Sequence, residues 1–352
     1  MKNKDKFLKT LLKEIELQKD YLQGREINTV YFGGGTPSML SAFEVQNIFD
    51  KLNRYHNINS DAEITLEANP DDINKEKLRE LKALQVNRFS MGVQSFFNDD
   101  LHYLNRVHDA SQAERSIKLA QDAGFNNITI DLIYGIPTLT TDKWNQNLEK
   151  FLQLDIPHLS AYSLTVEDKT ALKTLIDRKK LPAVKEEESI KHFKILGKKM
   201  KENDFIHYEI SNFARKGFYS NHNSIYWMGG HYLGLGPSAH SFNGKSRQWN
   251  HASIAKYLQL SAYKETHYEK EVLSFEQKYN EYIMTSLRTT WGCDLEHIAN
   301  VFGKEYAARC LQDAKPFITD SMIRKENNKL FLTDKGKLFA DGIASKLFLE
   351  EI

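Results

Sequence analysis

The chain has 352 residues, 41% of them hydrophobic, and a formal net charge of +1. This is enough for one large domain plus a smaller one, and the near-neutral charge gives no reason to expect nucleic acid or an anionic membrane surface as a partner. No apolar run approaches the roughly 20 residues that span a bilayer. The N-terminus predicts an amphipathic helix and lacks the apolar core of a signal peptide, so we expect a cytoplasmic protein. The apolar positions of this helix are Phe7, Leu8, Leu11, Leu12 and Ile15.

A glycine loop follows the first predicted strand. Residues 29–32 form a short apolar run, and Gly33–Gly35 come directly after it. Three glycines leave backbone N–H groups open to a ligand. Pro37 is expected to start the next helix, whose buried face would carry Phe43, Ile48 and Phe49. This pattern indicates a site for an anionic or zwitterionic small molecule, although a tight turn in any α/β protein has the same pattern.

Four more strands are predicted, and polar residues lie near the end of each. The strand segments cover residues 64–70, 88–95, 128–137 and 158–165, and their late polar residues are Glu67, Gln94, Asp131, Ser163 and Thr165. Helical periodicity separates the strands, near residues 42–55, 74–84, 110–123 and 142–154. Strands that alternate with helices predict a parallel sheet. An open doubly wound sheet and a barrel both fit, but polar residues at several strand ends favour the barrel.

From Tyr208 to Phe242 the chain is dense in glycine, asparagine, histidine and aromatic residues. A long irregular stretch is usually functional or disordered, and the aromatic residues argue against disorder. Tyr226 and Trp227 could stack on a flat macrocycle, and neutral imidazoles could ligate a metal or heme iron. The alternative is that each histidine only holds a loop by hydrogen bonds. The histidines concerned are His222, His231 and His240.

After about residue 265 the pattern changes to two helices and a β-wing. Residues 279–287 are predicted to be helical, Asp294 to cap a second helix, and residues 331–337 to form a strand and turn before a last helix. The arrangement is winged-helix-like, but no basic face emerges, so we do not expect DNA binding. The two cysteines of the chain, Cys293 and Cys310, lie in this part and are expected to be free.

Several short motifs occur in a fixed order along the chain. They are Gly33-Gly34-Gly35-Thr36-Pro37, Glu67-Ala68-Asn69-Pro70, Gly92-Val93-Gln94-Ser95, Leu104-Asn105-Arg106-x-His108 and Asp131-Leu132-Ile133-Tyr134-Gly135-Ile136-Pro137. In this combination the chain resembles the oxygen-independent coproporphyrinogen III oxidase-like radical SAM family over essentially its whole length. Two further segments resemble the heme chaperone branch of that family rather than the true oxidases. They are His222-Asn223-x-x-Tyr226-Trp227 and Gly234-x-Gly236-Pro237-Ser238-Ala239-His240-Ser241.

The resemblance implies an α/β fold, namely a partial (β/α)6 TIM-like barrel that lacks its first strand, plus a small C-terminal winged-helix-like α+β domain. The barrel would cover residues 1–205. A segment rich in histidine and aromatic residues, 206–264, would complete the site, and the C-terminal domain would cover 265–352.

The resemblance also implies two ligand sites. S-adenosylmethionine (SAM) is expected at Gly34, Gly35, Thr36, Glu67, Gln94, Arg106 and Asp131. The loop N–H groups suit the methionine moiety, Arg106 its carboxylate and Glu67 its amino group, while Gln94 and Asp131 suit the ribose hydroxyls. Without the family, a surface salt bridge would explain Arg106 and a helix cap would explain Asp131. Heme, or a related porphyrin, is expected at His222, Tyr226, Trp227 and His240.

The family carries a Cys-x-x-x-Cys-x-x-Cys loop whose thiolates hold a [4Fe–4S] cluster. Met1 stands at the helix that should follow this loop, and neither Cys293 nor Cys310 can replace its cysteines. We therefore expect an N-terminally shortened chain that does not cleave SAM reductively as written, with the cluster present only in the full-length family form. The strand at 30–32 would then be a sheet edge without its neighbour.

Our main hypothesis is a radical SAM heme chaperone that binds SAM and heme and passes heme to a target protein. The alternatives are an oxygen-independent coproporphyrinogen III oxidase, a heme-binding protein without cluster or catalysis, and a (β/α) phosphosugar enzyme that uses the glycine loop for phosphate.

Overall fold

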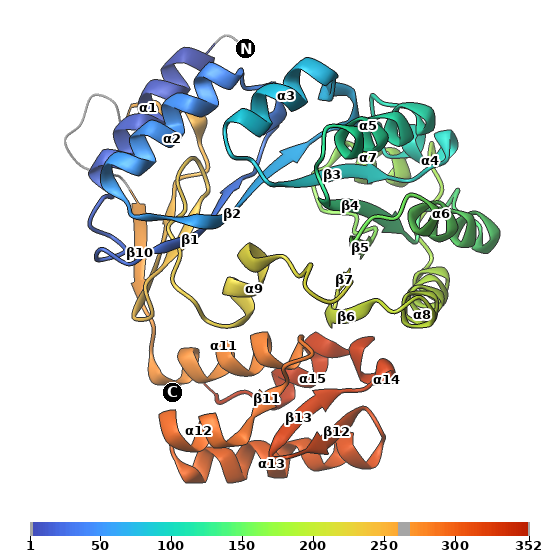
Figure 1. Cartoon of the computed structure of the whole chain (residues 1–352). Coiled ribbons are helices and arrows are strands. Elements are labelled where there is room, and N and C mark those ends of the chain that lie inside the picture. Colours follow the sequence, from blue (N-terminus) through green and yellow to red (C-terminus); the bar gives the residue numbers. More distant parts are fainter. Residues whose placement is uncertain (1–2, 260–267, 351–352) are drawn as a thin grey trace. The chain divides into compact units, whose positions relative to one another are not determined.

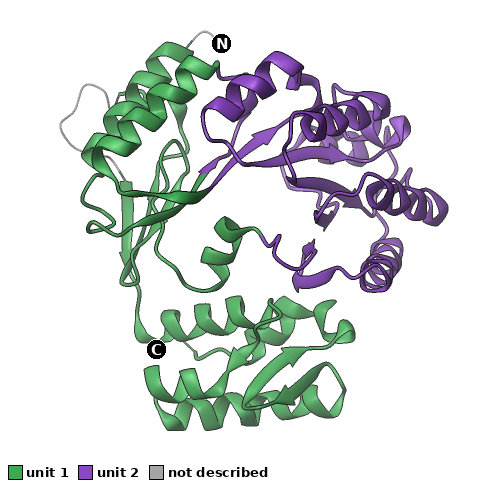
Figure 2. Cartoon of the chain, in the orientation of Figure 1, with its two compact units in different colours: residues 1–30, 41–62, 220–352 green, residues 31–40, 63–219 purple. Residues whose placement is uncertain are grey.

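The structure of the chain is a computed structural model that describes residues 3–259 and 268–350 (Figure 1). The chain divides into two compact units (Figure 2). Unit 1 comprises residues 1–30, 41–62 and 220–352, and unit 2 comprises residues 31–40 and 63–219. No helix within the described ranges is long and apolar enough to cross a membrane.

A seven-stranded sheet with the order β1-β2-β3-β4-β5-β7-β6 organises unit 2, and β1 and β2 continue into unit 1. Strands β2 to β5 pair in parallel, whereas β7 pairs antiparallel with both β5 and β6. The strands are β1 (Ile27–Phe32), β2 (Ile58–Ala68), β3 (Arg88–Gln94), β4 (Asn127–Tyr134), β5 (His158–Ser163), β6 (Ile206–Glu209) and β7 (Asn212–Ala214). In the described sheet, β1 stands at one end of the order, as expected for the strand at 30–32.

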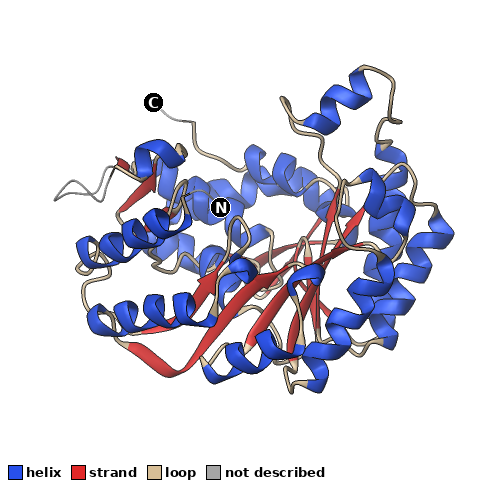
Figure 3. Cartoon of the chain, turned by 90° about the horizontal axis from the view of Figure 1, so that it is seen from above, coloured by secondary structure: helices blue, strands red, loops and turns tan. Residues whose placement is uncertain are grey.

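Helices of unit 2 cover one face of this sheet, as Figures 1 and 3 show. They are α3 (Lys75–Ala83), α4 (Asn98–Tyr103), α5 (Ala110–Asp122), α6 (Thr141–Gln153) and α8 (Glu186–Glu202). Helix α7 (Ala171–Asp177) follows β5 and has no buried residue. Side chains alternate along each strand, so in β3 the buried Phe89, Met91 and Val93 point to one face while Arg88 and Gln94 point to the other. The apolar face forms the core with the helices, and the polar face is left to carry the site.

These elements confirm the predicted α/β partial barrel. The four helices expected from periodicity are α2 (Ala42–Tyr55), α3, α5 and α6, and each boundary lies within one residue of its predicted position. Two local predictions are wrong at the glycine loop. Pro37 opens a separate 3₁₀ turn, because a capping box formed by Ser41 and Glu44 starts α2 only at Ala42. Phe43 is 74% exposed, since this start turns it away from the buried Ile48.

Composition suggested that residues 208–242 form an irregular stretch, but the structure contains regular elements there. The stretch contains the end of β6, all of β7, helix α9 (Asn221–Trp227) and strand β8 (His240–Phe242). Strands β6 and β7 form a hairpin around the two residues Ile210 and Ser211, with a register shift. Elements of three to seven residues are too short to show a periodic pattern in the sequence.

In unit 1, helices α1 (Lys4–Leu17) and α2 accompany the antiparallel sheet β8-β9-β10 and a C-terminal group of helices with its own sheet, β11-β13-β12. The elements not yet given are β9 (Ser246–Asn250), α10 (Ile254–Tyr257), β10 (Tyr268–Val272), α11 (Phe275–Leu287), β11 (Cys293–Asp294), α12 (Leu295–Val301), α13 (Lys304–Thr319), β12 (Ile323–Glu326), β13 (Lys329–Leu332), α14 (Asp334–Lys337) and α15 (Ala340–Lys346). The order of helices and hairpin is the one predicted, and the Asp294 carboxylate caps α12 by accepting from two backbone N–H groups. The strand predicted at 331–337 ends at Leu332, because Thr333 caps the short helix α14.

Candidate functional site

The glycine loop after β1 is fixed by a hydrogen bond to the carboxylate of Glu67. Gly34 and Gly35 have φ values of 74° and 68°, and a Cβ at either would meet nothing within 4 Å. The Gly34 N–H donates to one Glu67 carboxylate oxygen at 3.0 Å, and the Tyr31 hydroxyl donates to the other at 2.8 Å. Thr36 ends the loop, and its carbonyl accepts from the first turn of the 3₁₀ segment. Both glycines are exposed, so their backbone faces a possible ligand.

At the end of β3, the side-chain amide oxygen of Gln94 has no hydrogen-bond partner among the described residues. Gln94 has φ 67°, in the left-handed region that non-glycine residues rarely adopt. Its side-chain oxygen is buried. Gly92 allows this crowding, because a Cβ there would lie 2.9 Å from the Gln94 amide nitrogen and 3.3 Å from Arg106 Nη2. Arg106 Nη2 donates to Asn69 Oδ1 at 2.9 Å.

Asp131, on the neighbouring strand β4, is held by a tyrosine. Burial raises the pKa of Asp131 to about 7, and the charge of Glu67 acts in the same direction. A hydrogen bond to Tyr162 and the positive charges of Arg88 and Arg106 lower the pKa of Asp131 in part. The charges of both Glu67 and Arg106 therefore reach Asp131 on the polar face of the sheet.

Three residues near these groups were missed in the sequence. Tyr31 and Tyr162 donate to the two carboxylates, and Asn69 holds the guanidinium of Arg106. Burial raises the pKa of both tyrosines, so they stay protonated donors. The alternation of strand residues could have found Tyr162, because it shares a face of β5 with Ser160, whose hydroxyl donates to it at 2.9 Å.

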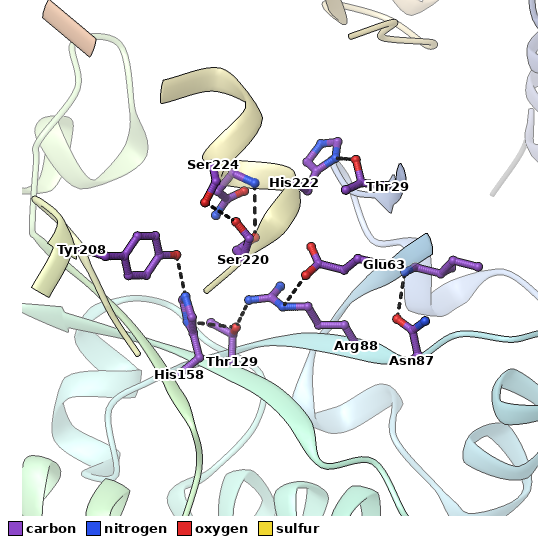
Figure 4. A network of polar contacts seen from close by, with 12 residues as sticks. Thr29, Glu63, Asn87, Arg88, Thr129, His158, Tyr208, Ser220, His222 and Ser224 are labelled. Atoms are coloured by element: carbon purple, nitrogen blue, oxygen red, sulfur yellow. Dashed lines mark hydrogen bonds and ion pairs between the residues drawn. The ribbon is translucent and has the colours of Figure 1, made fainter. Parts of the chain in front are cut away.

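A buried polar layer lies on the same face of the sheet, one step toward the start of the strands (Figure 4). Arg88 is 1% exposed, its Nε lies 3.9 Å from the Glu63 carboxylate, and its Nη2 donates to Thr129. The Thr129 hydroxyl is 3.0 Å from His158 Nδ1, and His158 Nε2 is 2.7 Å from the Tyr208 hydroxyl. Burial lowers the pKa of His158 well below its ordinary value, with help from the charge of Arg88, so this imidazole is neutral.

The second expected site, on α9 in unit 1, brings two of its four residues together. Ser220 caps the helix, and His222 and Tyr226 follow one turn apart on the same side. His222 Nε2 lies 2.8 Å from the Tyr226 hydroxyl. His222 Nδ1 lies 2.8 Å from the Thr29 hydroxyl of β1, as Figure 4 shows. Burial raises the pKa of Tyr226 to about 12, so its hydroxyl stays protonated.

The other two expected heme residues contact different partners. The Trp227 ring lies under the Arg288 guanidinium at 5.3 Å, since it points from another side of α9. His240 is exposed on β8 and stacks on Trp249 with ring centroids 6.0 Å apart. Within the described residues, Tyr226 makes no ring contact with Trp227 or His240; its ring packs edge-on against Tyr232, with ring centroids 4.7 Å apart.

The loop that leads to His240 is held by a buried carboxylate of α1 that the sequence pattern did not reveal. Glu14 accepts from the Gly236 N–H at 2.9 Å, Asn250 Nδ2 at 2.5 Å and the Tyr257 hydroxyl at 2.6 Å. Burial raises the pKa of Glu14, and these three hydrogen bonds oppose that rise. Gly234 is required in the loop, because a Cβ there would lie 2.2 Å from the His240 carbonyl oxygen.

Comparison with known proteins identifies the family. The model of the radical SAM superfamily matches residues 2–151, and the model of the HemN C-terminal domain matches residues 273–339. The heme chaperone HemW of Bacillus subtilis is 34% identical over 324 residues, which cover 90% of this chain and 84% of that protein. HemW of Lactococcus lactis is 31% identical over 348 residues, with 99% and 90% covered. The chain belongs to the HemW family of heme chaperones.

A solved structure has the same fold as this HemW family member. Coproporphyrinogen III oxidase (HemN) from Escherichia coli, a radical SAM enzyme, superposes with a TM-score of 0.85 over 99% of this chain and 84% of that chain, at 23% identity. These findings confirm the predicted radical SAM family, its partial barrel and the heme chaperone branch.

The residues present fit SAM. The unpartnered Gln94 oxygen, the open glycine loop and the carboxylates of Glu67 and Asp131 offer acceptors and donors for an amino acid and a ribose. They do not fit a [4Fe–4S] cluster, which thiolates hold. The only cysteines of the sequence, Cys293 and Cys310, are both buried on elements of the C-terminal part, and a hydrogen bond between their thiols, with burial, raises the pKa of Cys293. Within the described ranges, no group of three His, Cys, Asp or Glu side chains could hold a metal ion.

Proposed function

We propose that this HemW family member binds SAM on the half-barrel, binds heme at α9, and delivers heme to a recipient protein in the cytoplasm. The setting of His222 carries the heme part of this proposal. Its imidazole is only half-buried and lies edge-on to the ring of Tyr226, which is 39% exposed. An imidazole with an exposed aromatic ring next to it suits an iron porphyrin, which needs one metal ligand and flat apolar contacts.

Titration of the whole chain with ferric heme tests the role of His222. We expect a saturable Soret change for the wild type, and binding at least tenfold weaker in His222→Ala because the iron loses its ligand. His251→Ala is the matched control, since His251 is also half-buried in unit 1 but pairs with Glu269. Equal heme affinity in His222→Ala and the wild type would contradict the proposed site.

SAM would be held by the loop N–H groups, Glu67, Gln94, Arg106 and Asp131. Calorimetric titration with SAM should show binding that falls at least tenfold in Arg106→Gln, because a charged fork to the SAM carboxylate is lost. Arg115→Gln on the exposed face of α5 serves as the control. If Arg106→Gln binds SAM with wild-type affinity, the guanidinium does not contact SAM.

A second candidate is a heme carrier without radical chemistry. The observation that favours it is the position of Cys293 and Cys310, both buried in the C-terminal part. Anaerobic reconstitution with iron and sulfide should then leave this chain without a stoichiometric cluster while heme binding persists. Four iron and four sulfide per chain, with an electron paramagnetic resonance signal that SAM perturbs, would exclude this candidate.

A further inference from the structure

Both ring nitrogens of His222 have a hydroxyl at hydrogen-bond distance. The Thr29 hydroxyl stands 2.8 Å from Nδ1, and the Tyr226 hydroxyl stands 2.8 Å from Nε2. The three side chains come from β1 and α9, and all belong to unit 1. Figure 4 shows Thr29 and His222 facing each other.

The chemistry of the two hydroxyls assigns the proton on the imidazole. A neutral imidazole has one N–H donor and one bare acceptor nitrogen. A phenol is more acidic than an aliphatic alcohol and is therefore the better donor. Tyr226 O–H thus donates to Nε2, and the Nδ1–H of His222 donates to Thr29. This arrangement leaves Nε2 as the nitrogen that carries the lone pair.

We propose that Thr29 is a positioning residue for heme ligation, and that the Tyr226 hydroxyl occupies the iron-binding nitrogen of His222 until heme arrives. The inference rests on the proposed function of His222. Histidines that bind metals nearly always donate their second ring N–H to an oxygen acceptor, which fixes the tautomer and the ring orientation. The Thr29 hydroxyl, 2.8 Å from Nδ1, stands at the distance that this role requires.

Heme binding is then an exchange at one nitrogen. The Fe–Nε2 bond forms and the Tyr226 O–H···Nε2 hydrogen bond breaks, while the phenol keeps its proton and turns away. Tyr226 has room to turn because its side chain is 39% exposed. The Nδ1–H···Thr29 hydrogen bond persists and strengthens the basicity of the ligand.

Three variants test this exchange by heme affinity and by the Fe–His stretching frequency in the resonance Raman spectrum of the ferrous complex. Thr29→Val should weaken heme binding 10- to 100-fold and lower the Fe–His frequency, whereas Thr29→Ser should keep both. Tyr226→Phe should bind heme roughly fivefold more tightly, because one competing hydrogen bond is gone. Asn28→Ala, at the exposed neighbour of Thr29, controls for damage to β1.

The outcomes separate this inference from the proposed function. If His222→Ala binds heme like the wild type, the proposed function fails. If His222→Ala loses heme but Thr29→Val matches the wild type in affinity and frequency, only the role of Thr29 is overturned. Weaker binding in Tyr226→Phe would show that the phenol contacts heme itself, and would overturn the exchange. Circular dichroism and urea unfolding of Thr29→Val establish that any loss is not a failure to fold.

Discussion

Asp131→Asn should stabilise the protein and weaken its ligand binding at the same time. Asp131 is held on the polar face of the sheet with a pKa of about 7 instead of 3.8, mainly because of burial. An acid whose pKa is raised in the folded state makes the free energy of unfolding fall as pH rises from its unfolded pKa through its folded pKa. The stability that protonated Asp131 confers is thus fully present below about pH 3.8 and is lost by about pH 7.

The size of this loss follows from the two pKa values. A difference of about three pKa units corresponds to roughly 4 kcal/mol at pH 8 and roughly 2 kcal/mol at pH 5. These are upper limits, because the Asp131 side chain is partly exposed to solvent. Asparagine keeps the carbonyl oxygen that accepts from Tyr162 and has no charge to bury, so the loss should disappear in the variant.

Urea unfolding of the wild type and Asp131→Asn at pH 5, 6, 7 and 8 measures the effect. The stability advantage of the variant should grow over this range by roughly 2 kcal/mol. SAM binding at pH 8 should weaken 10- to 100-fold, since a hydrogen bond to a charged acceptor is worth about 1.5–3 kcal/mol. Asp122→Asn, at the exposed end of α5, is the matched control.

An advantage of Asp131→Asn that does not change with pH would refute the reasoning, because the aspartate would then carry no raised pKa. An unfolding free energy below that of the wild type at pH 8 would refute it too, since it would mean that the charged form stabilises the fold. If the SAM affinity of Asp131→Asn is unchanged, Asp131 does not contact SAM, whatever its pKa.

The other predictions concern buried polar groups. Glu14→Gln should lower the free energy of unfolding by roughly 3 kcal/mol, because an amide cannot accept all three hydrogen bonds of the buried carboxylate. Glu16→Gln removes only solvent-screened ion pairs with Lys13 and Lys51 and should cost less than about 1 kcal/mol; urea unfolding compares the two. Cys293 and Cys310 should stay unreactive toward a thiol reagent in the native protein and react after unfolding, since both are fully buried; rapid native labelling would contradict this. Arg88→Met should cost about 3–5 kcal/mol, because it leaves the adjacent carboxylate buried without this cation; a loss below 1 kcal/mol in the same assay would show that the layer is already hydrated.

Local patterns were good predictors of the elements of the half-barrel. Four helices between the strands, α2, α3, α5 and α6, were found within one residue, because apolar periodicity and capping residues are local features. The helices α4, α7 and α8 were not predicted. Local patterns predicted burial poorly where a nearby capping residue sets the start of the helix. Phe43 looked like a core residue, but the cap at Ser41 sets the helix phase that exposes it.

The candidate SAM residues were predicted from the resemblance of short motifs to a known family. The residue types alone would have left Arg106 as a surface salt bridge and Asp131 as a helix cap. Their partners were not predicted. Arg88, His158 and Glu14 meet groups that are far away in the sequence, so no spacing could show that they would be buried and paired.

The sequence by itself determined the family, the α/β half-barrel and the polar residues at the strand ends, since these depend on residue type and local spacing. Only the tertiary structure decided which of these residues share a site. The motif around His222 reads as one unit in the sequence, yet α9 turns Tyr226 toward the imidazole and Trp227 toward Arg288. The partner of the other ring nitrogen, Thr29, comes from a strand that lies almost 200 residues earlier, at a separation of 193. Burial, charge coupling and hydrogen bonds depend on distances in space, and those distances are set only when the distant segments pack.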